Sequence, residues 1–239
     1  MITKQLGFVI NRIQYSESSI IVRVFTRDLG LKSFLVQGVR KKKAKTKANL
    51  FQPLSLVEIT FRYKESANMH RANTCSLSTT YSSIPYDFLK SSQAIFLAEL
   101  LYKSLHESDP HIDLFDWLRI HLVWFDGSDE GVSNFHLFAG WHITRFLGIM
   151  PETGSDHYFD LLNGNFTHEN TGQYSVDKEY GDAVKYLLST SFEDMHELKL
   201  NRKTRQILLD QLIMYYQLHL EGVREIKSKT VLQEVMDTL

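Results

Sequence analysis

The sequence predicts an α+β protein in which a small five-stranded barrel precedes a helical domain. Three observations carry this prediction. Residues 1–82 hold five short runs rich in β-branched and aromatic residues. From residue 83 onward, apolar residues recur three or four positions apart, which is the period of an amphipathic helix. Charge divides at the same place, because residues 1–82 carry a net charge of +10 and residues 83–239 a net charge of −11.

The strands are expected in close succession. Alternation is clearest at Val57, Ile59, Phe61 and Tyr63, and Gly30 lies in a turn signal between the second and third strands. Five short strands within about 80 residues favour a closed barrel such as the five-stranded OB-fold, an architecture that binds oligonucleotides. The five runs are residues 8–13, 19–26, 32–37, 55–63 and 72–78.

The second domain is expected to be all helical apart from one insert. Its third helix ends at Gly148, with Pro151 shortly after, and residues 152–175 form a turn-rich insert with a hairpin signal at Asn163-Gly164. The sequence therefore predicts an OB-fold domain over residues 1–82 and a helical domain over residues 83–239. The expected helices are residues 86–106, 110–125, 133–147, 178–189, 200–220 and 228–236.

Composition restricts the class of protein. The chain has 239 residues, 43% of them apolar, which is enough to bury a core. Its one cysteine, Cys75, allows neither an intrachain disulfide nor a cysteine-based zinc finger, and a free core thiol is typical of the reducing cytoplasm. The sequence shows no signal-peptide pattern and no apolar run of 18 residues, so we expect no membrane span.

Catalytic motifs are not found. No Gly-x-Ser-x-Gly elbow occurs. Two His-Glu pairs lack the second histidine that a zinc-protease helix needs, since Gly172 and Leu200 stand there. The stretch before Lys45 resembles a phosphate-binding loop but has Val39 and Ala44 where glycines are required. We therefore expect no catalytic residue and no cofactor.

The most informative stretch is residues 38–50, GVRKKKAKTKANL. It holds six basic residues and no acidic one: Arg40, Lys41, Lys42, Lys43, Lys45 and Lys47. Further cations on the same module extend the positive field, namely Arg23, Arg27, Lys32, Arg62, Lys64 and Arg71. Such a field on a barrel favours backbone-directed binding of a polyanion, with a solvated surface loop as the alternative. Of the strand aromatics Phe25, Phe34, Phe61 and Tyr63, some could stack bases, although most are expected in the core.

Several ordered motifs resemble the RecO family of DNA repair and recombination mediators. The first is a T-R-D-x-G turn at residues 26–30, followed by a G-x-R-K segment that begins at Gly38. Later come a Gly-x-x-Pro segment at residues 148–151, FDLLNGNF at residues 159–166, and IKSK at residues 226–229. The order of these pieces extends the resemblance over the whole chain.

The resemblance implies a function and partners. RecO-like proteins have an N-terminal OB-fold and a helical C-terminal domain. They bind single- and double-stranded DNA, anneal complementary strands, and work with RecR. They help to load RecA onto strands coated by single-stranded-DNA-binding protein (SSB), whose acidic tail they contact, and they do not act as bond-breaking enzymes. The resemblance implies a DNA face that includes Arg23, Lys32, Arg40, Lys41, Lys42 and Lys43, to which the charge run adds Lys45 and Lys47.

The insert departs from the family pattern. Many members carry a four-cysteine zinc element there, whereas residues 152–175 contain no cysteine. Two histidines, His157 and His168, make a poor structural zinc site. We therefore predict no metal and a small hairpin held by Phe159, Leu161 and Phe166.

A receptor for the acidic SSB tail is expected to be an apolar pocket edged by cations. In the acidic half of the chain, the candidate residues are Arg145, Arg202, Lys203, Arg205 and Leu208, with a solvated helix start as the alternative. Two other functions stay open: an adaptor whose basic loop binds an acidic protein or ribosomal RNA, and a hydrolase with an unrecognised site.

Overall fold

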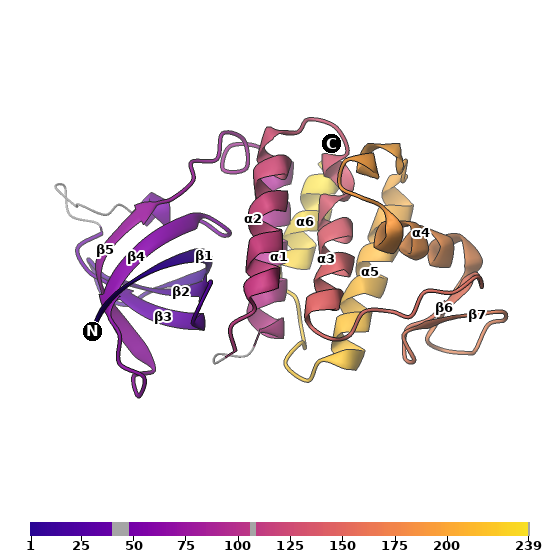
Figure 1. The fold of residues 1–239 in the computed structure, drawn as a ribbon. Helices are drawn as coiled ribbons and strands as arrows, with labels where there is room; N and C mark the ends of the chain where they lie inside the picture. Colours follow the sequence, from indigo (N-terminus) through magenta and orange to yellow (C-terminus); the bar gives the residue numbers. More distant parts are fainter. Residues whose placement is uncertain (40–47, 106–108, 239) are drawn as a thin grey trace. The chain divides into compact units, whose positions relative to one another are not determined.

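The computed structural model describes residues 1–39, 48–105 and 109–238 (Figure 1). It divides into two compact units. The first, here the barrel unit, comprises Met1–Asp87 and Leu105–Asp126, and the second, the helical unit, comprises Phe88–Ser104 and Gly127–Leu239. The domain boundary expected between residues 82 and 83 stays a prediction. The basic run at residues 40–47 lies outside the described residues.

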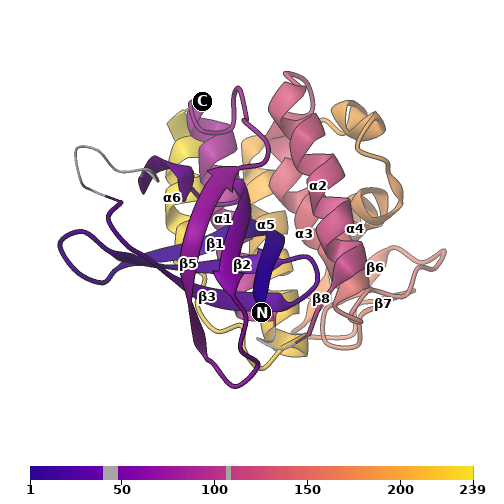
Figure 2. The ribbon, with the colours of Figure 1, turned by 60° about the vertical axis from the view of Figure 1, so that its left-hand side comes forward.

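Five strands close into a barrel in the order β1-β2-β3-β5-β4 (Figures 1 and 2). Neighbours are antiparallel except β3 and β5, which are parallel. This arrangement confirms the OB-like barrel expected from the sequence. The strands are β1 (Ile2–Gln14), β2 (Ile20–Thr26), β3 (Gly30–Val36), β4 (Leu56–Arg62) and β5 (Met69–Leu77), and a short 3-10 helix, η1 (Ala48–Leu50), precedes β4.

Strand β1 is longer than the apolar run at residues 8–13 indicated. Residues 2–8 pair with β4 and residues 7–14 pair with β2, with a register shift between Val9 and Asn11. Thr3, Lys4 and Gln5 form no apolar run, and they become a strand because β4 supplies hydrogen-bonding partners. The extra length lets one strand pair with two neighbours and close the barrel.

The barrel interior is a tightly filled apolar core. Cys75 belongs to it, and burial raises the pKa of its thiol to about 12, so the residue serves as a small core side chain. The other members are Val9, Ile20, Val22, Val24, Phe34, Val36, Val39, Phe51, Val57, Ile59 and Phe61. Three of the four strand aromatics considered for base stacking, Phe25, Phe34 and Phe61, are completely buried.

Helix α2 (Ile112–Gly127) belongs to the barrel unit. Its Phe115 packs against Phe8 and Phe25, with ring centroids 4.8 and 5.7 Å apart. Phe8 and Phe25 lie directly opposite each other on β1 and β2. Because side chains alternate along a strand, Phe8 points away from the interior that Val9 fills. Helix α2 therefore covers the outer face of these two strands.

The helical unit contains five α-helices within the described residues (Figure 1). They begin and end within two residues of the positions expected from sequence, which confirms the helical second half. They are α1 (Phe88–Ser104), α3 (Phe135–Phe146), α4 (Lys178–Ser189), α5 (Arg202–His219) and α6 (Ser228–Thr238), and two short 3-10 helices, η2 (Val132–Asn134) and η3 (Asp194–Glu197), lie between them.

Helices α3 and α5 run in the same direction (Figure 1), and two tyrosines of α5 hydrogen-bond to backbone carbonyls in and just after α3. The Tyr216 hydroxyl donates to the Gly140 carbonyl at 2.7 Å, and the Tyr215 hydroxyl donates to the Ile149 carbonyl at 2.7 Å. Helix α3 ends at Phe146, and Gly148 just beyond it has the left-handed conformation of a helix-ending glycine, with a φ of 72°. The N–H of Ile149 bonds back to the Thr144 carbonyl.

The insert forms a small sheet in the order β7-β6-β8, from β6 (Tyr158–Asp160), β7 (Asn165–Thr167) and β8 (Ser175–Val176). Strands β6 and β7 are antiparallel and confirm the expected hairpin. Phe159, Leu161 and Phe166 are buried as expected. Helix α4 approaches this sheet closely at Gly181, where a Cβ would lie 2.0 Å from the His157 carbonyl oxygen.

Of the helices in the described part of the chain, none has both the length and the apolar character that a membrane crossing requires.

Candidate nucleic-acid interface

Two of the eight residues expected to contact DNA lie in the described part of the chain. These are Arg23 on β2 and Lys32 on β3, and both are half-buried. The remaining six, Arg40, Lys41, Lys42, Lys43, Lys45 and Lys47, lie outside the described residues.

Arg23 and Lys32 point to opposite faces of the β2–β3 ribbon. Arg23 pairs with Ser33, and Lys32 pairs with Val24, so the two side chains alternate. Lys32 lies on the same face as Val24, a core residue. The charge of Lys32 lowers the pKa of His70, so the two residues lie at the same end of the barrel. The structure therefore does not bring Arg23 and Lys32 together.

An aromatic cluster lies at the same end of the barrel. The His70 ring lies 5.0 Å from Phe61, 5.5 Å from Tyr63 and 6.0 Å from Phe34, measured between centroids. Burial lowers the pKa of His70, and the charge of Lys32 lowers it further, so the imidazole is neutral near pH 7. Tyr63 is the one half-buried aromatic among the four considered for base stacking.

A hollow of about 490 Å3 lies beside this cluster, at the connection between β4 and β5. Three exposed cations line it: Arg62, Lys64 and Arg71. None of the three forms an ion pair with a described residue. The sequence had indicated these cations only as members of a general field. The remaining lining residues are Ile2, Ala67, Met69, His70 and Asn73.

The T-R-D-x-G motif has a structural role at the turn between β2 and β3. The Thr26 hydroxyl donates to the Gly30 carbonyl at 2.7 Å and closes the turn. Gly30 has a φ of 69°, and a Cβ there would lie 2.8 Å from the carbonyl oxygen of Asp109. Only glycine fits both the conformation and the space.

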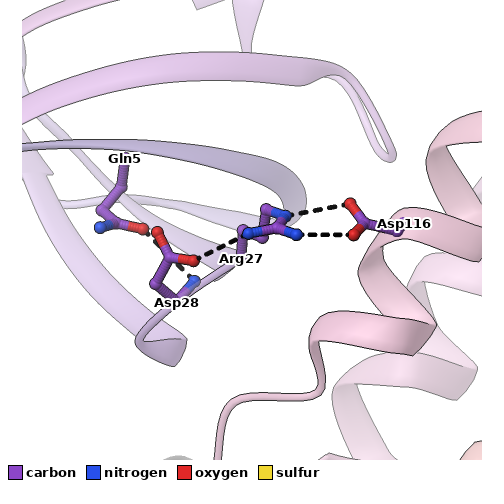
Figure 3. Close-up of polar contacts among 4 residues, drawn as sticks. All are labelled: Gln5, Arg27, Asp28 and Asp116. Atoms are coloured by element: carbon purple, nitrogen blue, oxygen red, sulfur yellow. Dashed lines mark hydrogen bonds and ion pairs between the residues drawn. The ribbon is translucent and has the colours of Figure 1, made fainter.

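The arginine of the same motif holds helix α2. Arg27 donates two hydrogen bonds to Asp116, at 3.0 and 2.7 Å, and a third to Asp28 at 3.2 Å (Figure 3). The N–H of Asp28 in turn donates to the Gln5 amide oxygen at 3.4 Å. The bond to Asp116 raises the pKa of Arg27, and it lowers the pKa of Asp116 against the effect of burial. Arg27 is therefore neutralised and contributes little to the positive field.

The residues expected to bind the SSB tail do not form one cluster. Leu208 is completely buried, and Arg205 is half-buried and donates to the Leu200 carbonyl at 2.9 Å. Arg202 is paired with Asp237 of α6, with Nε 2.5 Å from Oδ1. Lys203 remains exposed at the first turn of α5.

Arg145 lies away from the start of α5. It is exposed in the last turn of α3, between Gly140 and Ile149, whose partners are Tyr216 and Tyr215. Ten residues of helix separate Arg205 from Tyr215, or about 15 Å. The structure therefore separates Arg145 from the cations at residues 202–205.

The insert is organised without cysteine. The His157 ring pairs with Asp182 at 2.7 Å, and His168 is exposed. Within residues 1–39, 48–105 and 109–238, no group of three or more His, Cys, Asp or Glu side chains is placed to hold a metal ion. That no metal binds stays a prediction.

Comparison with known proteins agrees with this architecture. The family model described as "Recombination protein O N terminal" matches residues 1–81, and "Recombination protein O C terminal" matches residues 85–230. The chain is 35% identical to the DNA repair protein RecO of Bacteroides fragilis, over 99% of this chain and 100% of that one.

Two further relatives carry the same name. The DNA repair protein RecO of Phocaeicola vulgatus is 35% identical, over 98% of this chain and 99% of its own. That of Christiangramia forsetii is 32% identical over the same shares. Both halves of the chain match in order and over nearly their full length, and the chain therefore belongs to the RecO family of DNA repair proteins.

Proposed function

We propose that this protein is a DNA-binding recombination mediator that acts in the bacterial cytoplasm. In this role its barrel binds single- and double-stranded DNA through phosphate contacts, and it anneals complementary strands. With RecR, it helps to load RecA onto strands coated by SSB. None of these steps forms or breaks a covalent bond, and the role requires no catalytic residue.

The observation that carries the proposal is a set of unneutralised cations on the barrel. Lys4 and Arg27 are paired with carboxylates of the same unit, Glu58 and Asp116. Arg62, Lys64 and Arg71 form no such pair with a described residue, and the six cations at residues 40–47 have no acidic neighbour in sequence. Cations without partners release counterions from a polynucleotide when it binds, which favours association.

The path for a strand follows β3. The N–H of Val39, the last described residue before the basic run, donates to the Ser18 carbonyl at 3.0 Å, beyond the end of β3. Met69 to Arg71, at the hollow, pair with Ser33 to Leu35 of the same strand. Val39, which directly precedes the basic run in sequence, and the hollow thus adjoin one strand of the barrel.

For the SSB tail, the proposed receptor is the first turn of α5. Lys203 is exposed there, and Arg202 could exchange Asp237 for a carboxylate of the tail. Arg205 and Leu208 would position this turn without contacting the tail fully, because the Arg205 side chain is half-buried and the Leu208 side chain is buried. Arg145 is left out of this receptor because it lies at the other end of α3.

Annealing of complementary oligonucleotides coated with SSB tests the proposed function. We expect wild type to accelerate annealing and Lys41→Ala/Lys42→Ala/Lys43→Ala to lose most of that acceleration. The matched control is Lys199→Ala/Arg224→Ala/Lys227→Ala, which likewise removes three positive charges, here from exposed residues of the helical unit.

Two results would contradict the proposal. Equal annealing by wild type and the loop variant would remove the role of the basic run. Weak DNA binding by wild type at low salt, together with tight binding of an acidic protein or ribosomal RNA, would instead identify an adaptor.

A further inference from the structure

We propose that the hollow between β4 and β5 is a nucleotide subsite that holds one nucleotide of a single strand, with its phosphate at Arg62, Lys64 and Arg71 and its base against Ile2 and Met69. This inference rests on the proposed function, since it assigns a second DNA contact to the same barrel. It is separate in sequence from the basic run at residues 40–47.

The pleat of the strands directs the lining side chains outward. On β5, Met69 and Arg71 are exposed while His70 between them is buried, so the first two share the outer face. Ile2 of β1 lies directly opposite Arg62 of β4 in the register. Two short outward patches, each with one cation and one apolar side chain, therefore meet at this corner of the barrel.

The chemistry of the lining fits a nucleotide better than a free anion. An inorganic phosphate would use only the three cations. The hollow also exposes large apolar side chains, because Ile2 is 64% and Met69 is 41% accessible to solvent. Its volume of about 490 Å3 falls in the range of small-molecule sites, roughly 300–1,000 Å3. A phosphate joined to a flat apolar base would use both kinds of surface.

The floor of the hollow is held in place by its buried histidine. His70 is 4% exposed and packs between Phe61 and Tyr63. Its ring also lies 6.0 Å from that of Phe34, measured between centroids. The buried ring therefore ties the end of β4 to the start of β5, which positions Arg62 and Arg71 before any ligand arrives.

Titration of the full chain with a fluorescent oligodeoxythymidine at several salt concentrations tests the subsite. For Arg62→Ala/Lys64→Ala/Arg71→Ala, we expect the slope of log K against log salt to become less negative by about 2, from three contacts at about 0.7 each. Raising the salt concentration from about 50 to 200 mM weakens binding of both proteins, and the loss of affinity should be about 20-fold smaller for this variant than for wild type. The Lys199→Ala/Arg224→Ala/Lys227→Ala variant should keep the wild-type slope.

A second variant separates the base contact from charge. Met69→Ala should weaken binding by about threefold and leave the salt slope unchanged, because it removes apolar contact with the base and no cation. Its control is Leu77→Ala, an exposed apolar residue on the same strand that does not line the hollow. Photocrosslinking to 5-iodouracil in the oligonucleotide should modify residues 62–73.

The outcomes distinguish this inference from the proposed function. If the hollow variant keeps the wild-type slope while the loop variant loses it, the subsite is wrong and the proposed function stands. If wild type itself does not bind the oligonucleotide at low salt, the proposed function fails. If the hollow variant loses binding of an acidic peptide ending in phenylalanine but keeps binding of the oligonucleotide, the hollow is a protein-binding site and the inference is overturned.

Discussion

One buried carboxylate, that of Asp160, stabilises the insert at residues 152–175 through several hydrogen bonds. Asp160 is 4% exposed and accepts hydrogen bonds from the N–H groups of Leu162 and Asn163, at 2.9 and 3.0 Å, and from the Thr171 hydroxyl at 2.8 Å. Burial raises the pKa of this carboxyl, but the hydrogen bonds outweigh burial and lower it overall. An ionised Asp160 therefore holds together the insert, which contains no cysteine.

Replacing Asp160 should destabilise the fold. We expect Asp160→Asn to lower the free energy of unfolding by about 2 kcal/mol, because it leaves buried donors without a charged acceptor. Urea denaturation at pH 7 measures this loss. The control is Asp177→Asn, whose exposed carboxylate precedes α4 without capping it, and its change should stay within about 0.5 kcal/mol.

The loss in free energy of unfolding caused by Asp160→Asn should depend on pH. A carboxyl whose pKa is lowered by folding stabilises the protein above its unfolded pKa, about 3.9, and loses that effect as pH falls through the folded value. The difference between wild type and Asp160→Asn should thus shrink below about pH 4. A difference that stays constant from pH 7 to pH 3 would show that the carboxylate charge is not what stabilises the insert.

His136 makes the stability of the fold depend on pH in a second range, above the one in which Asp160 titrates. It is completely buried. Its backbone N–H donates to the Gln93 amide oxygen at 2.9 Å, and its ring Nδ1 lies 3.2 Å from the same oxygen. Burial, together with the nearby charge of Arg205, lowers its pKa to about 3. The ring must stay neutral in the folded protein, whereas it binds a proton below about pH 6.5 once unfolded.

Acidification should therefore weaken the fold well before the carboxylates titrate. Between about pH 6 and 4, His136 alone should cost about 1.4 kcal/mol of stability per pH unit. Urea midpoints measured across this range should fall in wild type and fall less steeply in His136→Gln. Equal slopes for the two proteins would show that His136 does not take up a proton on unfolding.

At the scale of elements, helix α2 is tied to the barrel by apolar packing and by a paired arginine. Phe115 contacts Phe8 and Phe25, and Asp116 beside it receives two bonds from Arg27. The apolar contact should dominate, since Phe115 is completely buried while Arg27 and Asp116 keep over a third of their side chains exposed. The pair of Asp116 with Arg27 of the T-R-D-x-G motif thus supplements this apolar contact and does not replace it.

Substitutions along α2 separate these contributions. Phe115→Ala should lower the free energy of unfolding by about 3–5 kcal/mol, the usual cost of a cavity left by a buried phenylalanine. Asp116→Asn should cost less, and Ile120→Ala, at an exposed position of the same helix, should stay within about 0.5 kcal/mol. Chemical denaturation ranks the three, and a larger loss for Asp116→Asn than for Phe115→Ala would reverse this account.

For the whole molecule, the governing feature is the separation of charge along the chain. Residues 1–82 carry +10 and the rest −11, so the first third of the chain can attract a polyanion while the net charge is only −1. The basic run and the cations of the hollow both belong to this positive part of the sequence. Their contributions to salt dependence should add, because each contact displaces its own counterion.

Combined variants test this addition. If all six cations of the run and all three of the hollow contact phosphates, the wild-type slope of log K against log salt should be about −6. The loop variant and the hollow variant should each change it by about 2, and the sextuple variant by about 4. A sextuple variant no different from either triple would indicate one shared contact.

Much of the fold could be predicted from sequence because it depends on local periodicity. Alternation at residues 57–63 and helical spacing after residue 83 gave the strands and helices, and Asn163-Gly164 gave the hairpin. The start of β1 was not predicted, because Thr3 to Gln5 have no strand-like pattern and become a strand through pairing with β4. For the site, the cations were identifiable as residues, but which of them share a face was not.

By itself, the sequence determined the order of barrel and helices, the positive first third, and membership of a DNA repair family through its ordered motifs. Only the tertiary structure decided that Arg27 is neutralised by Asp116, that Arg23 and Lys32 face opposite ways, and that Arg62, Lys64 and Arg71 gather at one hollow. The reason is physical: periodicity is a property of neighbours along the chain, whereas the partner of a charge is set by residues that folding brings close from far away in sequence.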